Sequence, residues 1–212
     1  MKLRLLWPMV LALAGTAVGA GAAVPGHNAD PDWPCQQIKV PELSVGAMWT
    51  GPSIDAYRTT WSQDPRIAAL AARLMQRRLP TEQAKAEITA FAQHAGAQKQ
   101  AKLLALFAGV FADASQERGS ILAGLDRFGR RQKELAAAIR AESETLHGPP
   151  SATETDVAPT AGLQNRLQWD LKVFQDRRES LGYACQAPGL VEQRLFALAR
   201  AIQAQLPEAA AQ

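Results

Sequence analysis

Residues 98–147, QKQAKLLALFAGVFADASQERGSILAGLDRFGRRQKELAAAIRAESETLH, decide the fold of this 212-residue chain. Apolar residues recur through this stretch at steps of three, four or seven, which places them on one face of an α-helix. They are Leu103, Phe107, Val110, Ala114, Ile121, Leu125, Phe128, Leu135, Ile139 and Leu146. The stretch predicts one long central helix with a coiled-coil-like seam, or two stacked helices. Unbroken, it would reach roughly 75 Å at about 1.5 Å per residue.

Glycines leave the continuity of this helix open. Gly109, Gly119, Gly124 and Gly129 each cost on the order of 1 kcal/mol relative to alanine inside a helix. A kink or break near Gly119 is one reading, and the sequence does not decide whether the helix continues from Gly119 to Gly129. Polar residues also interrupt the seam, which fits a helix only partly covered by its neighbours.

Shorter helical patterns flank the central stretch. They predict a short helix over 53–63 and further helices over 65–79, 81–95, 162–181 and 188–206. Residues 148–161 have no apolar periodicity and predict a flexible loop, and residues 208–212 predict a frayed tail. No alternating stretch predicts a sheet. We therefore expect an all-α helical domain over residues 53–207, built as an irregular antiparallel bundle around the long central helix.

Residues 24–52 predict an extended N-terminal strap that lies on the helical body. Proline at this density argues against a helix, because proline lacks a backbone N–H and restricts the preceding residue. The segment is also too apolar for a disordered tail. Its prolines are Pro25, Pro31, Pro34, Pro41 and Pro52, and its large apolar residues are Trp33, Val40, Leu43, Val45, Met48 and Trp49.

The first 23 residues predict a cleaved secretory signal peptide. Lys2 and Arg4 precede a 14-residue, largely apolar run that ends at Val18, and small residues follow up to Ala23. The run is shorter than the about 20 residues that span a bilayer. We expect a periplasmic or secreted product without a transmembrane segment. Without the two basic residues of this leader, 21 basic and 20 acidic residues remain, so clustered positive charge does not point to nucleic acid.

Cys35 and Cys185 are the only cysteines of the chain. In an exported protein, two cysteines most simply form one intramolecular disulfide. This disulfide would tie the strap to the turn before the last helix. A redox-active pair is the rival reading, but redox enzymes usually carry Cys-x-x-Cys, and these cysteines lie far apart in the sequence.

Two groups of residues are candidates for binding. Trp33 and Trp49 belong to the strap, either as anchors pressed into the helical body or as the walls of a groove between strap and helices. Arg127, Arg130 and Arg131 form a basic cluster, either as a solvated helix face with local ion pairs or as a patch for an acidic partner.

No catalytic or cofactor motif is present in the sequence. It contains no glycine-rich phosphate loop and no Gly-x-Ser-x-Gly turn, and its three histidines lie far apart. We therefore predict neither cofactor nor metal. The leading hypothesis is an exported, non-enzymatic protein that binds another envelope component through its helical surface or strap groove. A periplasmic small-molecule binder, or an enzyme using carboxylates and arginines on envelope material, are the alternatives, and a homo-oligomer fits as well.

Overall fold

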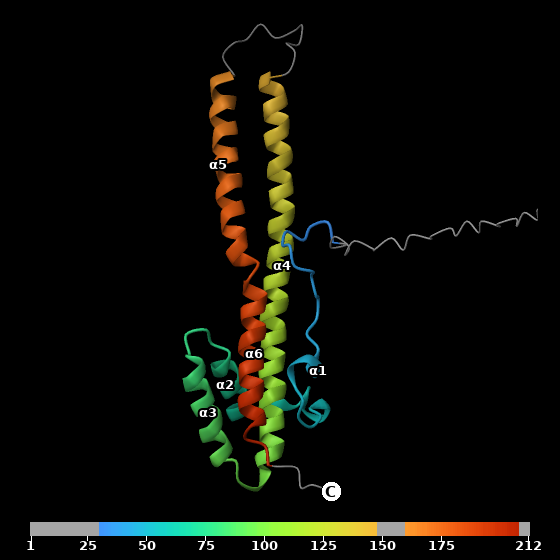
Figure 1. Ribbon diagram of the computed structural model, residues 1–212, viewed down its shortest axis with the longest axis vertical. Helices are drawn as coiled ribbons and strands as arrows, with labels where there is room; N and C mark the ends of the chain where they lie inside the picture. Colours follow the sequence, from blue (N-terminus) through green and yellow to red (C-terminus); the bar gives the residue numbers. More distant parts are fainter. Residues whose placement is uncertain (1–29, 148–159, 208–212) are drawn as a thin grey trace, which may run out of the picture.

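The computed structural model describes residues 30–147 and 160–207. The predicted signal peptide (1–23), the first part of the strap, most of the predicted loop 148–161 and the predicted tail 208–212 lie outside the described residues. All regular secondary structure in the described ranges is helical, as predicted (Figure 1). The elements are α1 (Val45–Met48), α2 (Pro65–Leu74), α3 (Thr81–Gln93), α4 (Lys99–His147), α5 (Thr160–Ala184), α6 (Ala187–Gln203) and the 3-10 turns η1 (Asp55–Tyr57), η2 (Trp61–Gln63) and η3 (Gly96–Gln98).

The long central helix is one continuous element, so there is no break near Gly119. Helix α4 contains all four glycines of its stretch. Two of them are points of close approach: a Cβ on Gly109 would lie 2.6 Å from a ring carbon of Trp61, and one on Gly129 would collide with the backbone of Asp32. Gly109 and Gly129 therefore allow other parts of the chain to pack closely against the central helix. The apolar seam on either side of them is long enough to keep the helix intact.

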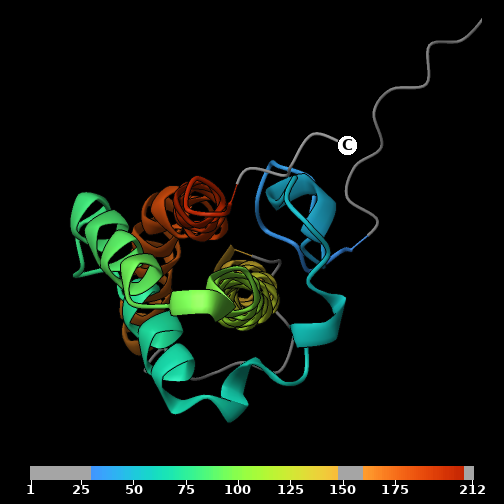
Figure 2. The ribbon, with the colours of Figure 1, turned by 90° about the horizontal axis from the view of Figure 1, so that it is seen from below.

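The body of the molecule forms around the N-terminal half of α4. Figure 2 shows α4 end-on, with α2, α3, α6 and the strap around it. Phe107 at the centre of the core is completely buried, and it stacks on Trp49 of the strap with ring centroids 4.1 Å apart. Helix α2 begins where expected, because the Asp64 side chain accepts hydrogen bonds from the backbone N–H groups of Arg66 and Ile67.

Several predicted boundaries are wrong. Residues 53–63 form two separate 3-10 turns, η1 and η2, instead of a short helix. Helix α2 ends at Leu74 and α3 at Gln93, both earlier than predicted, and Gly96 takes a positive φ of 62° at the start of η3. Helix α5 extends beyond its predicted range at both ends and includes two residues of the predicted loop. Apolar periodicity shows which face of a helix is buried. The residues at which a helix begins and ends depend on local turns, which the periodicity does not describe.

The strap runs along α4 as predicted, but it is not extended throughout. Residues 45–48 form the single-turn helix α1, which contacts α6. From Cys35 to Ser44 the strap has no helix or strand. The strap therefore lies on the body as an irregular segment with one helical turn near its end.

The C-terminal part of α4 and the whole of α5 extend away from the body as a two-helix hairpin (Figure 1). Helix α6 then returns along the N-terminal half of α4, antiparallel to it. None of the described helices is long and apolar enough to cross a membrane.

Candidate functional site

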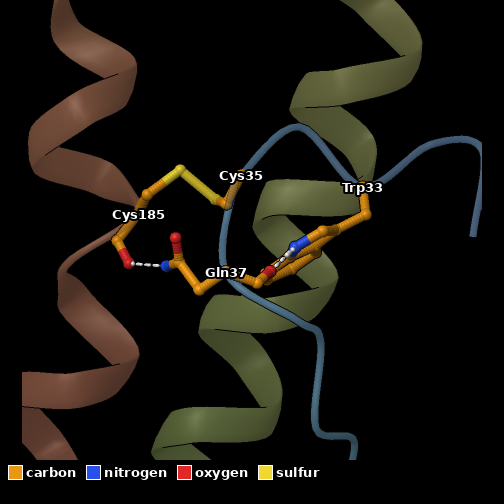
Figure 3. The surroundings of a disulfide bond; sticks show 4 residues. All are labelled: Trp33, Cys35, Gln37 and Cys185. Carbon is orange, nitrogen blue, oxygen red and sulfur yellow. Dashed lines mark hydrogen bonds between the residues drawn. A yellow bond between two sulfur atoms is a disulfide. The ribbon is translucent and has the colours of Figure 1, made fainter. Parts of the chain in front are cut away.

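The predicted disulfide between Cys35 and Cys185 is confirmed. Its Cα atoms lie 5.7 Å apart, and it joins the strap to the junction between α5 and α6 (Figure 3). Two hydrogen bonds support it: the Gln37 side-chain amide donates to the Cys185 carbonyl at 2.5 Å, and the Trp33 indole donates to the Gln37 carbonyl at 2.7 Å. Trp33 and Cys35 pack with Leu122 and Leu125 of α4 in a small apolar cluster. The covalent bond is therefore embedded in a packed region.

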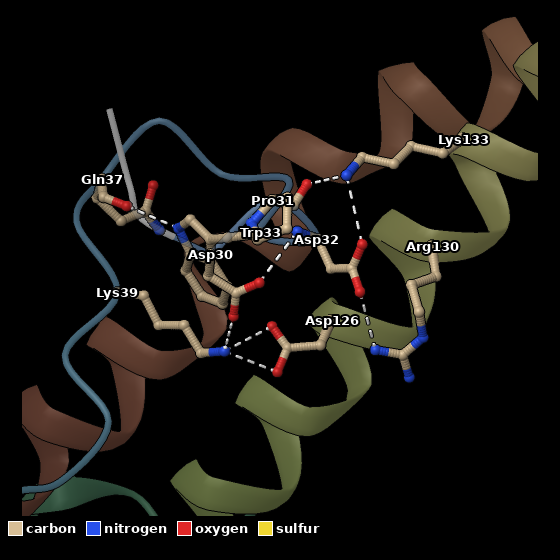
Figure 4. A network of polar contacts seen from close by, with 9 residues as sticks. All are labelled: Asp30, Pro31, Asp32, Trp33, Gln37, Lys39, Asp126, Arg130 and Lys133. Carbon is tan, nitrogen blue, oxygen red and sulfur yellow. Dashed lines mark hydrogen bonds and ion pairs between the residues drawn. The ribbon is translucent and has the colours of Figure 1, made fainter. Parts of the chain in front are cut away.

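Ion pairs fix the strap to α4 beside this cluster (Figure 4). The Lys39 ammonium donates to both carboxylate oxygens of Asp126 at 2.8 Å and contacts Asp30 at 2.5 Å. These partners raise the pKa of Lys39, and the hydrogen bond from Lys39 lowers the pKa of Asp30. Lys39 also lies over the Trp33 ring, 5.6 Å from its centroid.

A groove opens below the disulfide, between the strap and the start of α6. We call it the strap groove; it is lined by Trp33 and most strap residues from Gln37 to Met48, by Arg118 and Leu122 of α4, and by most residues from Cys185 to Gln193. Its volume is about 710 Å³. Ile38, Val40 and Leu190 line it with side chains that are 68%, 53% and 59% exposed. Because these large apolar side chains are exposed to solvent, the groove is a surface on which another molecule can pack and not part of the packed interior.

Arg118 forms the polar base of the groove. The residue is only 5% exposed, and its guanidinium pairs with Glu192 of α6 at 2.5 Å and donates to the Pro41 carbonyl of the strap at 3.3 Å. One side chain of α4 thus holds both walls of the groove. A buried cation is stable only when its charge and its donors are matched, and Glu192 and Pro41 supply part of that match.

Trp33 and Trp49, the two tryptophans that the sequence offers as binding candidates, anchor the strap to the helical body. Trp49 is buried in the main core, and its indole donates to the Pro52 carbonyl at 2.7 Å. Trp33 is buried against α4, although one side of it lines the strap groove. The sequence left two roles open for these tryptophans, as anchors or as groove walls. Trp49 is an anchor, whereas Trp33 is an anchor that also lines the edge of the strap groove.

Arg127, Arg130 and Arg131, the candidate binding residues of the basic cluster, do not form one patch in the structure. Arg130 pairs with Asp32 of the strap at 3.3 Å, together with Lys133, which contacts Asp32 and the Pro31 carbonyl. Arg127 and Arg131 are exposed on a different side of α4 and have no ion pair among the described residues. The basic cluster is therefore divided between strap attachment and a solvent-facing pair.

Sequence reasoning missed Arg118, Ile38 and Leu190 as groove residues. Arg118 interrupts the apolar seam of α4 and lies two to three turns before the basic cluster, and neither feature indicates a groove. No group of three or more potential metal ligands converges within the described ranges. Comparison of the chain with protein-family models, with curated proteins and with solved structures found no match.

Proposed function

We propose that this protein is an exported, non-enzymatic binding protein of the cell envelope, and that its strap groove holds a segment of another protein. One observation carries the proposal: Ile38, Val40 and Leu190 converge from the strap and α6 on a single open groove. Exposed apolar side chains gathered in a groove are typical of protein-binding sites.

The chemistry of the groove favours a polypeptide with apolar side chains. Arg118 and Lys39 line it, but their charges are engaged by Glu192 and by Asp126, so they do not offer a free cation to an anionic ligand. The walls remain open to solvent, whereas small-molecule sites usually enclose most of their ligand. A short segment that places apolar side chains between the strap and α6 fits these conditions best.

Two features support export. The sequence carries a predicted signal peptide over residues 1–23, and the disulfide is of the kind that persists in oxidising compartments such as the periplasm. The bond joins residues 150 positions apart in the sequence and gives the strap wall of the groove a fixed position.

The proposal is tested with a groove variant, Ile38→Asp/Leu190→Asp, and a matched control, Phe196→Asp. Phe196 is also an exposed apolar residue of α6, but it lies outside the groove. Peptides selected from a displayed random 12-residue library on the wild-type protein should carry apolar residues. We expect the groove variant to weaken their binding at least tenfold and the control to bind like wild type, as measured by fluorescence anisotropy.

The same variants decide the physiological partner. A protein recovered from the envelope fraction by wild type and by Phe196→Asp, and lost with Ile38→Asp/Leu190→Asp, would support the proposal. Peptide binding that is unchanged in the groove variant would contradict it. A small molecule that raises the melting temperature of wild type but not of the groove variant would identify the groove as a ligand pocket instead.

A further inference from the structure

A second pocket lies next to the strap groove, on the side of α6 that faces α2 and α3. We call it the Arg194 pocket; it is lined by Met75 and Arg77, which follow α2, by Thr81 of α3, by Glu117 of α4 and by residues of α6 between Leu190 and Ala197. Its volume is about 360 Å³. Leu190 and Gln193 line both this pocket and the strap groove, so the two are adjacent.

The Arg194 guanidinium is held in the wall of this pocket by backbone carbonyls. Its Nε donates to the Leu74 carbonyl at 2.8 Å, and its Nη1 donates to the Leu79 carbonyl at 3.0 Å. The third nitrogen, Nη2, is buried and donates no hydrogen bond to any residue that the structure describes. The two carbonyls orient the side chain, but they do not neutralise its charge.

The residues that line the pocket carry a net charge of +1, from two arginines and one glutamate. Glu117 Oε1 accepts hydrogen bonds from Arg77, at 2.8 Å from Nη2 and 3.1 Å from Nε. Arg194 has no ion pair among the described residues. Burial lowers the pKa of Arg194 and attraction to Glu117 opposes this effect, but an arginine remains charged at neutral pH. A partly buried cation without a counterion is stabilised by an anion that enters its pocket.

The two neighbouring sites therefore differ in charge. In the strap groove, Lys39 and Arg118 are paired with carboxylates of the chain itself. In the Arg194 pocket one positive charge is left over, beside the apolar side chains of Met75 and Leu190. A single excess charge matches one carboxylate, whereas the two charges of a phosphate would leave negative charge next to Glu117.

We propose that the segment held in the strap groove carries an acidic side chain, and that this side chain enters the Arg194 pocket. The inference rests on the proposed function of the groove and specifies the chemistry of its partner. The charge complementarity between Arg194 and a carboxylate selects among apolar segments that would otherwise bind alike.

The spacing on α6 fixes where the acidic residue lies in the partner. Leu190 and Arg194 are about one helical turn apart, which is roughly 6 Å along the axis at about 1.5 Å per residue. An extended chain covers this distance in about two residues, at about 3.3 Å per residue. We therefore expect Asp or Glu about two positions from the apolar residue that packs on Leu190.

The peptides selected from the displayed library test this spacing. Replacing their Asp or Glu by Asn or Gln should weaken binding to the wild-type protein at least tenfold in 50 mM salt. The difference should shrink in 500 mM salt, because salt screens partly exposed charges. Amidation of the peptide C-terminus should have no effect. A loss on amidation, without a loss on replacement of the side chain, would assign the pocket to a terminal carboxylate and overturn the proposal.

A variant beside Arg194 tests the pocket on the protein side. Substituting Arg194 itself would release the two carbonyls that it holds, so the charge is changed at Ala197, which lines the pocket three residues later on the same helix. Ala197→Glu supplies a carboxylate from within the chain and should weaken the acidic peptide at least tenfold, but not its Asn or Gln counterpart. The control Ala197→Gln has the same size without the charge and should bind both peptides like wild type.

The variant Ile38→Asp separates this inference from the proposed function, because Ile38 lines the strap groove but not the Arg194 pocket. Peptides that lose affinity for Ile38→Asp, but respond equally to Ala197→Glu and Ala197→Gln, would overturn the acidic contact and leave the groove as the binding site. Peptides that bind Ile38→Asp like wild type would contradict the proposed function itself. Circular dichroism of each variant confirms that it is folded.

Discussion

Gly129 of the central helix faces the backbone carbonyl of Asp32 so closely that a Cβ atom at this position would collide with it. The strap therefore crosses α4 at a place where only a glycine leaves room for its backbone. Gly119, two to three turns earlier in the same helix, has nothing within 4 Å of the corresponding position. The two glycines have the same helical conformation but opposite surroundings.

This contrast predicts opposite effects of the same substitution. Gly129→Ala should destabilise the protein by about 1–3 kcal/mol, because the strap must shift to make room for the methyl group. Gly119→Ala should stabilise it by about 0.5–1 kcal/mol, because alanine restricts the unfolded chain and favours helix. Urea unfolding followed by circular dichroism measures both. Equal effects of the two substitutions would show that the strap does not cross at Gly129.

The disulfide should contribute strongly to stability. Cys35→Ser is expected to lower the free energy of unfolding by a few kcal/mol, up to about 5, since the bond closes a loop of 150 residues in the unfolded chain. Cys185→Ser and the double variant should have the same effect as the single variant, because each removes the same bond. Wild type in excess dithiothreitol is the control. Two alkylatable thiols in freshly exported wild-type protein would contradict this prediction.

The sequence predicted the features that depend on helical periodicity and on covalent pairing. The seam from Leu103 to Leu146 predicted either one long helix or two stacked helices, and the structure shows one continuous helix. Two cysteines in a chain predicted to be exported left one simple pairing. The apolar pattern of the long helix does not show which other parts of the chain pack on it. Gly129 was read as a possible weak point of the helix, although its role is to admit the backbone of a segment almost 100 residues away.

The groove was less predictable, because its walls come from three separate parts of the chain. Ile38 and Leu190 are ordinary apolar residues in sequence, and contacts between distant parts of the chain, among them the disulfide and the Arg118 contacts, bring them to one place. Trp33 and Trp49 were the stronger signals, and they mark where the strap is fixed. The large aromatic residues of the strap mark the points where it is attached to the body. Smaller, exposed apolar residues such as Ile38 and Leu190 form the candidate binding surface.

Attachment of the strap should depend on pH at both extremes. The pKa of Asp30 is lowered in the folded protein, so its contribution is present above its unfolded pKa of about 3.9 and is lost as pH falls through the folded value. The pKa of Lys39 is raised, so its contribution is present below about 10.4 and is lost as pH rises through the folded value. Trp33 fluorescence should change at both limits, because the indole lies under Lys39.

The variant Lys39→Met isolates this pH effect. It removes the cation from Asp30 and Asp126 but keeps an apolar stem over Trp33. We expect the alkaline change in fluorescence to disappear and the acidic change to shrink. Arg73→Met, which removes an exposed ion pair with Glu87 in the body, serves as the control and should leave both changes in place. Identical pH profiles for wild type and Lys39→Met would rule out the Lys39 network as their source.

The buried pair at the base of the strap groove predicts an asymmetry between its two partners. Glu192→Leu should destabilise the protein by about 3 kcal/mol or more, because the almost completely buried Arg118 then keeps its charge without a counterion. Arg118→Met should cost less, about 1–2 kcal/mol, since the Glu192 side chain is partly exposed and water can replace its partner. The double variant Arg118→Met/Glu192→Leu should be more stable than Glu192→Leu alone, because no charge remains buried. Urea unfolding of the three variants completes the double-mutant cycle. A larger loss from Arg118→Met than from Glu192→Leu would mean that the Pro41 contact, rather than the ion pair, holds the strap over the groove.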